Sequence, residues 1–305
     1  MPVSNYTGFP AGLTIGNVPI TMTNPDKAFW VSSTSGSNGN KGTYQRPFAT
    51  LAYALTQCTA ALGQIVVIKP GHAETVATAA AITFGTKTSV AVVGLGYGSH
   101  RPTFNFTATT STITMTAANC AMKNCLFTGG IDAVVSPIVV SAADCVLESN
   151  EIRDVTGQVT DGILTTAGAN RLRILDHIHK GDTAAGTNAG IAIVGGDSIE
   201  IQARIMDGNF AVGCVDIRTT ATTNLYMHDC GRMYTRNSAD IILIDTITGS
   251  TGQIGPWING RLTDNAANIT EAFTGATFVY MQPLNLVNLA GESSMFTNIT
   301  ASTDA

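Results

Sequence analysis

The feature that most constrains this sequence is an internal repeat of about 25 residues. Four segments align with one another, at residues 112–120, 137–145, 162–170 and 190–198, and two weaker copies follow at 214–220 and 241–246. Their starts are 25, 25, 28, 24 and 27 residues apart. A unit of this length cannot bury an apolar face alone, so each copy must stack on its neighbours to form a core.

Within each copy, the second and fourth residues form a pair on one face of a strand. Eleven of these twelve residues are apolar: the pairs are Ile113/Met115, Ile138/Val140, Ile163/Thr165, Ile191/Ile193, Val215/Ile217 and Ile242/Ile244. A period of two is typical of a strand with one buried face. Two further short apolar stretches follow each pair, so each repeat predicts three strands. We therefore predict an all-β protein, a right-handed parallel β-helix (a solenoid) of about eight coils.

The composition agrees with this fold. Charged residues make up 12% of the chain, against roughly 25% in an ordinary soluble protein. Apolar residues make up 44%, which excludes a disordered chain, because disorder combines low hydrophobicity with high charge. The 43 threonines and 31 glycines favour narrow β layers over bulky helical packing.

The charge balance and the apolar runs exclude two kinds of partner. The formal net charge is −5, and the 16 Lys and Arg residues are scattered, so we expect no nucleic-acid partner. The sequence has no apolar run of membrane-spanning length and no secretory signal, so we expect no membrane partner and assembly in a host cytoplasm. The glycine run at residues 94–98 does not open a helix, and we expect no cofactor and no metal.

Both ends of the chain lack the repeat. Residues 1–40 are rich in Gly, Ser, Asn, Thr and Pro and predict an extended N-terminal arm that is ordered only against a partner. Residues 41–265 are expected to form a capping helix and the solenoid. Residues 266–305 are expected to form a C-terminal cap or a subunit-exchange segment.

An amphipathic helix is predicted between Arg46 and Gly63. Pro47 can begin it, and Gly63 can close it. The apolar residues on one helical face are Phe48, Leu51, Ala52, Leu55 and Leu62. A helix at this place would cap the first coil, which otherwise exposes an edge that can pair with another strand.

Two stretches near the N-terminus resemble known families. Residues 42–51 (GTYQRPFATL), followed by the strand 65–71 (IVVIKPG), resemble the opening of many right-handed β-helix proteins, although Gln64 stands where that family usually has Asp. Residues 9–19 (FPAGLTIGNVP) are similar to virion structural proteins of tailed bacteriophages. These resemblances imply a phage particle protein built on a β-helix, as a homotrimer.

The main hypothesis is therefore a non-enzymatic virion structural protein, a capsid decoration (cement) protein that binds the phage major capsid protein. Such a trimer would stabilise the head by burying apolar surface across capsid boundaries. The N-terminal arm would carry the capsid contacts. Its candidate contact residues are Tyr6, Phe9, Leu13, Ile15 and Val18.

The residues between the inward pairs form an outward column that is poor in charge. We expect this column to be the trimer interface. Its apolar residues are Val139, Leu164, Ala192, Val194 and Leu243, and its ion pair comes from Asp216, Arg218 and Asp245.

Asp216, Arg218 and Asp245 also resemble the carboxylate sites of pectate-lyase-like and tailspike β-helices. The alternative hypothesis is therefore a phage tailspike or fibre that binds or cleaves host polysaccharide. Carbohydrate sites favour exposed aromatic residues, and the predicted column has none, so we assign no catalytic residue.

Two further expectations concern single positions. Alternation places Ile178 inward, so the imidazoles of His177 and His179 are expected to point outward as a solvated pair. Asn119, Asp144, Asn170 and Asp197 recur at one turn of the repeat, where we expect them to take the left-handed bend.

Overall fold

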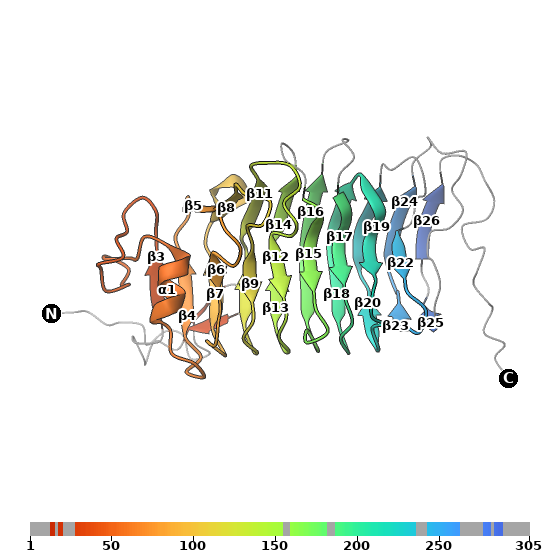
Figure 1. Ribbon diagram of the computed structural model, residues 1–305, viewed down its shortest axis with the longest axis horizontal. Coiled ribbons are helices and arrows are strands. Elements are labelled where there is room, and N and C mark those ends of the chain that lie inside the picture. The colour runs from red at the N-terminus through yellow and green to blue at the C-terminus, as the bar shows by residue number, and fades with distance from the viewer. Residues whose placement is uncertain are drawn as a thin grey trace.

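The computed structural model shows an elongated column of parallel strands (Figure 1). The structure describes residues 13–15, 18–20, 28–154, 159–181, 187–235, 243–262, 277–281 and 284–288. The chain winds around the column, and the strands of each coil pair with the equivalent strands of the next coil. The β-solenoid that the repeat predicts is confirmed.

Three rows of strands form three faces of the column. Face 1 is a sheet of seven strands, one in each turn: β6 (Ile82–Thr83), β9 (Ile113–Met115), β12 (Ile138–Val140), β15 (Asp161–Thr165), β17 (Thr187–Ile193), β19 (Phe210–Ile217) and β22 (Ile244–Thr246). This sheet gives about seven turns, close to the eight expected.

Faces 2 and 3 belong to one sheet of 17 strands. Face 2 holds β3 (Ala28–Val31), β4 (Ile65–Ile68), β7 (Ala91–Gly94), β10 (Ala121–Lys123), β13 (Val146–Glu148), β20 (Leu225–Met227), β23 (Thr251–Ile254) and β25 (Thr277–Tyr280). Face 3 holds β5 (Ala73–Val76), β8 (Thr103–Phe106), β11 (Leu126–Gly129), β14 (Glu151–Asp154), β21 (Cys230–Thr235), β24 (Ile258–Leu262) and β26 (Leu284–Asn288). β16 (Arg173–Gly181) and β18 (Glu200–Gly208) run through the corner and belong to both faces.

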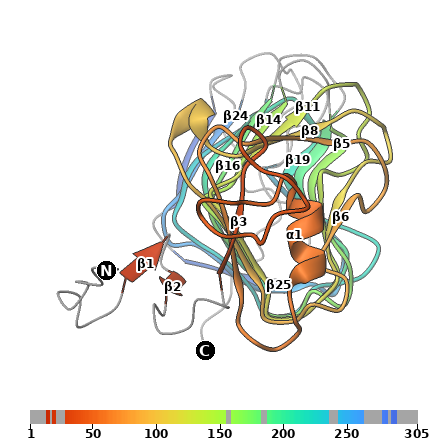
Figure 2. The same ribbon diagram turned by 90° about the vertical axis from the view of Figure 1, so that its left-hand side faces the viewer.

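Inward side chains form one continuous core along the column. Seen from one end, the coils lie over one another around this shared interior (Figure 2). The stacked residues from face 1 are Ile113, Ile138, Ile163, Ile191, Val215 and Ile244, all fully buried. Each coil places a β-branched residue on the one below, which is why the repeat keeps these positions apolar.

The last copy of the repeat is offset from the predicted alignment by two residues. Its inward pair is Ile244 and Thr246, which align with Val215 and Ile217. Leu243 precedes β22 and is fully buried, so the prediction that it belongs to the outward column is wrong. The copy begins with four consecutive apolar residues, and such a run does not let alternation choose between registers.

One α-helix, α1 (Leu51–Gln57), is present in the described residues. It lies against β3, β4 and β6 near one end of the column (Figures 1 and 2). Because β6 is the end strand of face 1, the helix covers an edge that could otherwise pair with another chain. No helix in the described ranges combines the length and apolarity needed to span a membrane.

The helix is shorter than predicted because Thr50, and not Pro47, starts it. The Thr50 hydroxyl accepts a hydrogen bond from the N–H of the third helical residue at 3.2 Å. The Glu74 carboxylate accepts another from the N–H of the first helical residue at 2.7 Å. These bonds satisfy free donors of the first turn. Leu62 lies beyond the helix and is 50% exposed.

The solenoid extends past the predicted boundaries at both ends. β3 pairs in parallel with β4, although it lies within residues 1–40. β25 and β26 pair with β23 and β24, although they lie within residues 266–305. Strand pairing uses backbone groups, so a coil can form where the side-chain pattern of the repeat has faded. In the predicted arm, β1 (Leu13–Ile15) and β2 (Val18–Ile20) pair as a separate antiparallel hairpin.

The turn between faces 1 and 2 uses left-handed residues, as predicted. Asn119 and Asp144 have φ values of 58° and 59°. In the next two coils the left-handed residue comes one position later than predicted, at Arg171 and Ser198. The bend is thus a property of the coil geometry, and Asn and Asp are two of several residues that take it.

His177 and His179 lie inside the column, so the prediction of a solvated pair is wrong. Asp176 has a φ of 51°, and the register between β16 and β18 shifts on both sides of His177. The strand turns a corner at Asp176, so Ile178 aligns with Glu151 and points outward, whereas His179 aligns with Ile152 and points inward, as His177 does. His177 is 1% exposed and His179 is 0% exposed.

Neither buried imidazole has a hydrogen-bond partner among the described residues. His179 packs edge-on against the ring of Phe210, with the ring centres 5.1 Å apart. Burial lowers the pKa of His177 to about 4 and that of His179 to about 3. Both side chains are therefore neutral at pH 7 and behave as apolar core residues.

We predict that acid destabilises the column through these two histidines. Each imidazole has a pKa near 6.5 when unfolded and about 4 or 3 when folded, so the unfolded chain binds more protons as the pH falls below 6.5. At about pH 4.5 each histidine should lower the free energy of unfolding by about 2 kcal/mol. Replacing both, as His177→Leu with His179→Met, should remove most of the difference in urea-unfolding free energy between about pH 7.5 and about pH 4.5.

The exposed His100 provides the control for this measurement. His100→Gln should leave the pH dependence of stability unchanged. An acid sensitivity that persists in full in the double variant would place its origin in other groups.

Candidate functional site

Face 1 brings together most of the residues predicted for the trimer interface. Five of them align across neighbouring strands in one outward column: Val139, Leu164, Ala192, Asp216 and Asp245. Val194 and Arg218 directly follow β17 and β19. The side chains of Val139 and Leu164 are partly exposed, whereas Ala192 is fully buried.

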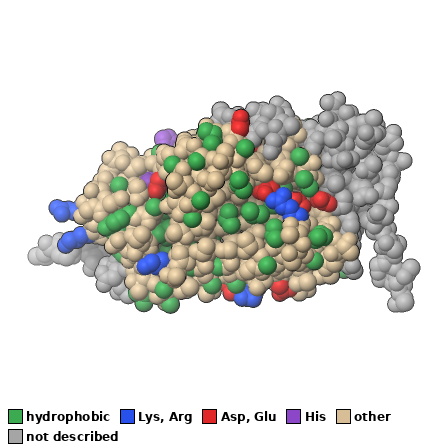
Figure 3. Space-filling view, viewed as in Figure 1, with side chains coloured by type: hydrophobic (Ala, Val, Ile, Leu, Met, Phe, Trp, Pro, Cys, Tyr) green, Lys and Arg blue, Asp and Glu red, His purple; other side chains and the backbone are tan. Residues whose placement is uncertain are grey.

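A buried ion cluster lies at the charged end of this column. The Arg218 Nη1 atom donates to Asp216 Oδ2 at 3.1 Å, and its Nη2 atom pairs with Asp161 Oδ2. The side chains of Asp161 and Asp216 are each 3% exposed. Because Asp161 lies on β15 and Arg218 follows β19, the guanidinium joins coils that are two turns apart. In Figure 3, charged side chains of both signs gather on this face among mostly uncharged atoms.

Burial changes the acidity of the two carboxyl groups. It raises the pKa of Asp216 to about 6, with Arg218 opposing and the charges of Asp245 and Asp161 reinforcing the shift. Burial also raises the pKa of Asp161, and one oxygen of this carboxylate has no hydrogen-bond partner in the described residues. A carboxyl that titrates near neutral pH can give or take a proton during a reaction.

Asp161 was not among the residues predicted from the sequence. It is separated from Arg218 by 57 residues, and it stands one position before the aligned copy that begins at residue 162. Only the stacking of coils shows that the two side chains meet. Within the described ranges, no three His, Cys, Asp or Glu side chains converge as a metal site would require.

A second candidate site is an open hollow at the corner between faces 2 and 3, which we call the corner hollow. Its volume is about 360 Å³. The side chains that line it come from successive coils: Tyr97, Arg101, Asn124, Ser149, Glu151, Asp176, Ile178 and Arg204. Three of these residues, Asn124, Ser149 and Asp176, take the same left-handed turn, with φ values of 56°, 55° and 51°. The hollow is thus built from one turn that recurs along the column.

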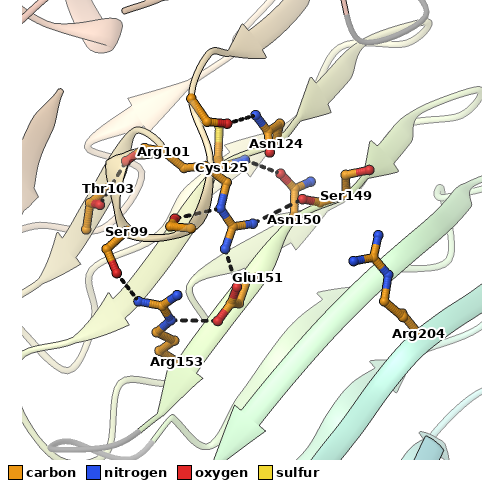
Figure 4. Close-up of polar contacts among 12 residues, drawn as sticks. Ser99, Arg101, Thr103, Asn124, Cys125, Ser149, Asn150, Glu151, Arg153 and Arg204 are labelled. Atoms are coloured by element: carbon orange, nitrogen blue, oxygen red, sulfur yellow. Dashed lines mark hydrogen bonds and ion pairs between the residues drawn. The ribbon is translucent and has the colours of Figure 1, made fainter. Parts of the chain in front are cut away.

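Arg101 and Glu151 form the buried side of the corner hollow. Arg101 is 7% exposed and Glu151 is 4% exposed. The Arg101 guanidinium pairs with Glu151 Oε2, and its Nε donates to the carbonyl of Gly98 at 3.0 Å. Figure 4 shows Arg153 reaching Glu151 from the other side, with 2.6 Å between Arg153 Nε and Glu151 Oε1. Burial alone would raise the pKa of Glu151, but the bonds from Arg153 and Arg101 hold it below its ordinary value.

Arg204 and Asp176 form the outer side of the corner hollow. The guanidinium of Arg204 makes a two-pronged contact with the Asp176 carboxylate, with 2.5 Å between Arg204 Nε and Asp176 Oδ1. The Ser149 hydroxyl donates to the same carboxylate at 2.9 Å. Arg204 stands apart from the Arg101–Glu151 group in Figure 4, and its side chain is 57% exposed.

Tyr97 is exposed at the edge of the corner hollow. Its side chain is 91% exposed. The turn that carries it is held by Asn124, whose amide donates to the carbonyls of Gly94 and Gly96 at 2.9 and 3.1 Å. The hollow therefore combines an exposed aromatic ring with charged and polar groups that their own hydrogen bonds keep in place. The sequence signal was a tyrosine between glycines, within the glycine run at residues 94–98.

Comparison with known proteins adds one observation on the fold. No protein-family model matches the chain, and a search of the curated proteins finds no match. Among the solved structures, a rhamnogalacturonan lyase matches with 13% sequence identity over 88% of each chain and a TM-score of 0.37. At this distance the likeness concerns only the β-solenoid fold.

The prediction of a non-enzymatic chain is contradicted, because its premise does not hold for the whole surface. No catalytic residue was predicted because the outward column of face 1 has no exposed aromatic residue. Tyr97 is exposed at the corner between faces 2 and 3, outside that column. In addition, burial raises the pKa of Asp216 on face 1 to about 6.

Other expectations from the sequence stay predictions. Neither the fold nor the match bears on a bacteriophage origin, a homotrimer, a capsid partner or a location in the virion. In the predicted arm, Tyr6 and Phe9 lie outside the described residues. Leu13, Ile15 and Val18 lie in the hairpin of β1 and β2.

We predict that Arg218 stabilises the middle of the column. Arg218→Met would leave Asp161 and Asp216 buried without their counter-charge, so the free energy of unfolding at pH 7.5 should fall by about 3 kcal/mol. The control is Arg173→Met, which removes a more exposed ion pair with Glu200 and should cost less than about 1 kcal/mol. If urea unfolding shows equal losses of unfolding free energy in Arg218→Met and Arg173→Met, a structural role for the cluster is contradicted.

Proposed function

We propose that this protein binds polysaccharide and holds sugar units in the corner hollow. The observation that carries the proposal is the exposed ring of Tyr97 beside a hollow of about 360 Å³ lined by polar side chains. A concave site with an aromatic surface and a few convergent polar groups is the usual form of a small-molecule site.

The chemistry of the lining suits a sugar. Sugar hydroxyls both donate and accept hydrogen bonds, and the hollow offers guanidinium donors from Arg101 and Arg204 together with carboxylate acceptors from Glu151 and Asp176. The ring of Tyr97 offers an apolar face for the C–H groups of a sugar ring and a hydroxyl at its edge.

The site is largely organised before a ligand binds. Arg101 is fixed by Glu151 and Gly98, and Arg204 is fixed by Asp176. Side chains that already occupy one conformation lose little entropy on binding. The ion pairs therefore help binding, because they hold the donors and acceptors in place.

The length of the corner hollow favours a polymer over a single sugar. From Tyr97 to Arg204 the lining crosses four steps between coils. At the ~4.8 Å spacing of paired strands, this distance is about 19 Å along the column. A polysaccharide that ran along the corner would meet the same turn in each coil.

This proposal follows the alternative hypothesis from the sequence, a phage tailspike or fibre that acts on host polysaccharide. The role in head decoration rests on the resemblance of residues 9–19. The phage origin, the trimer and the capsid contact stay predictions.

Cleavage of polysaccharide at face 1, on another face of the column than the corner hollow, is a second candidate function. The observation that favours it is the Asp216 carboxyl, whose pKa burial raises to about 6, with Asp245 and Asp161 nearby. A carboxyl with such a pKa is protonated in part near neutral pH and can act as a general acid, while a neighbouring carboxylate can act as a base.

Binding through the corner hollow predicts a clear effect of Tyr97→Ala. Polysaccharides that bind the wild-type protein on a glycan array should bind the variant about tenfold more weakly in calorimetric titration. Tyr44→Ala removes another exposed tyrosine, which packs against Trp30 in the first coils, and should leave binding unchanged. If Tyr97→Ala binds as tightly as the wild type, the corner hollow is not the binding site.

Cleavage predicts new chain ends. Incubation with a polysaccharide that binds should release reducing ends or unsaturated sugars, and Asp216→Asn should lower the rate at least about 100-fold, because the amide cannot transfer the proton. Asp144→Asn, a change at an exposed carboxylate paired with Arg171, should retain the wild-type rate. Cleavage that persists in Asp216→Asn would place the chemistry elsewhere.

A further inference from the structure

A second hollow, which we call the face 2 hollow, lies on face 2 and begins on the coil after the one that carries Arg204. Its volume is about 460 Å³. Three of its lining residues align across β20, β23 and β25: Tyr226 pairs with Gln253, and Gln253 pairs with Val279. Asn224 and Thr251 complete its polar side. None of the side chains that line it is charged.

The ring of Tyr226 is fixed in position. It stacks on the imidazole of His228, with ring centres 4.2 Å apart and planes 21° apart. The imidazole is held in turn by Glu200 Oε1 at 3.2 Å from Nε2 and by Asp229 Oδ2 at 2.7 Å from Nδ1. One face of the Tyr226 ring is therefore covered. The side chain is still 37% exposed and lines the hollow, so its other face is available to a ligand.

The polar side of the face 2 hollow has groups left for a ligand. The side-chain amide of Gln253 makes no hydrogen bond within the described residues, and it carries both a donor and an acceptor. Asn224 is held by its Nδ2 atom, which donates to Asp197 Oδ1 at 2.8 Å. The fixed amide and the free amide thus flank one aromatic ring.

Gly252, between Thr251 and Gln253, lies where the backbone of β23 approaches that of β20. It has a φ of 151°, and a Cβ atom there would lie 2.1 Å from the carbonyl oxygen of Leu225. The close approach of the two backbones therefore requires glycine at this position. Gln253 lies between Tyr226 and Val279 in register, and Val279, 59% exposed, lines the hollow.

We propose that the face 2 hollow is a second saccharide site and that it takes a neutral sugar unit, stacked on Tyr226 and hydrogen-bonded to Gln253. The lack of a charged side chain in the lining disfavours a charged ligand, because a charge leaving water there would find no partner. The aromatic face and the amide instead match the C–H groups and the hydroxyls of an uncharged pyranose. This inference rests on the proposed function in one respect: a polysaccharide ligand would supply the neutral sugar units.

The test uses the full chain and an array of neutral oligosaccharides made of hexose, deoxyhexose or N-acetylhexosamine units, together with the uronate counterpart of each. Hits are measured by saturation-transfer NMR and by titration. Measurements in the Tyr97→Ala background remove the contribution of the corner hollow. In that background, at least one neutral oligosaccharide should still bind, and more tightly than its uronate counterpart.

Two substitutions then address the face 2 hollow. Tyr226→Ala should weaken the remaining binding by about tenfold or more, and Gln253→Ala should weaken it by about fivefold. Gln57→Ala changes an exposed amide on α1 and is the matched control. Tyr226→Phe keeps the ring and should retain most of the affinity, which separates stacking from a loss of folding.

The outcomes distinguish the two proposals. If Tyr97→Ala alone abolishes binding of every oligosaccharide, the inference about the face 2 hollow is wrong while the proposed function stands. If Tyr97→Ala has no effect but Tyr226→Ala abolishes binding, the corner hollow is not the site and the inference stands. Absence of binding by the wild-type chain to any member of the array would overturn both.

Discussion

Parallel pairing between equivalent strands of successive coils is the constraint on which this structure depends. Each coil has almost no interior of its own, and its apolar residues are buried only because the next coil lies in register above it. The stacked isoleucines of face 1 show the result, since the same position meets the same type of side chain from Ile113 to Ile191. The first coil would still have a free edge, and α1 covers it.

The same pairing places functional chemistry in columns. Residues about 25 positions apart in the sequence become neighbours at about 4.8 Å spacing, so a turn that recurs produces a row of equivalent side chains. Asn124, Ser149 and Asp176 form such a row at the corner hollow. The corner lies outside the core, so its side chains can vary in chemistry while the turn geometry stays the same.

The interior shows that a turn within a strand can change which of its residues point inward. The left-handed residue Asp176, which stands where Asn124 and Ser149 stand in earlier coils, decides which residues of β16 point inward, so that two histidines enter the core without hydrogen-bond partners. On face 1, Asp161 and Asp216 are also nearly buried, but Arg218 neutralises them. Buried polar groups in this column are therefore either neutral, as the histidines are, or paired across coils.

The sequence by itself determined the solenoid, its three strands per coil and the location of most inward residues, because a repeat with a period of two inside each strand has no other way to bury its apolar positions. It did not determine the register of the last copy, the orientation of His177, or the partnership of Asp161 and Arg218. These depend on single backbone irregularities and on which coils stack, and neither is visible as a pattern in the sequence. The corner hollow was likewise decided by the tertiary structure, because only the stacking of successive turns brings Tyr97 and Arg204 to the same site.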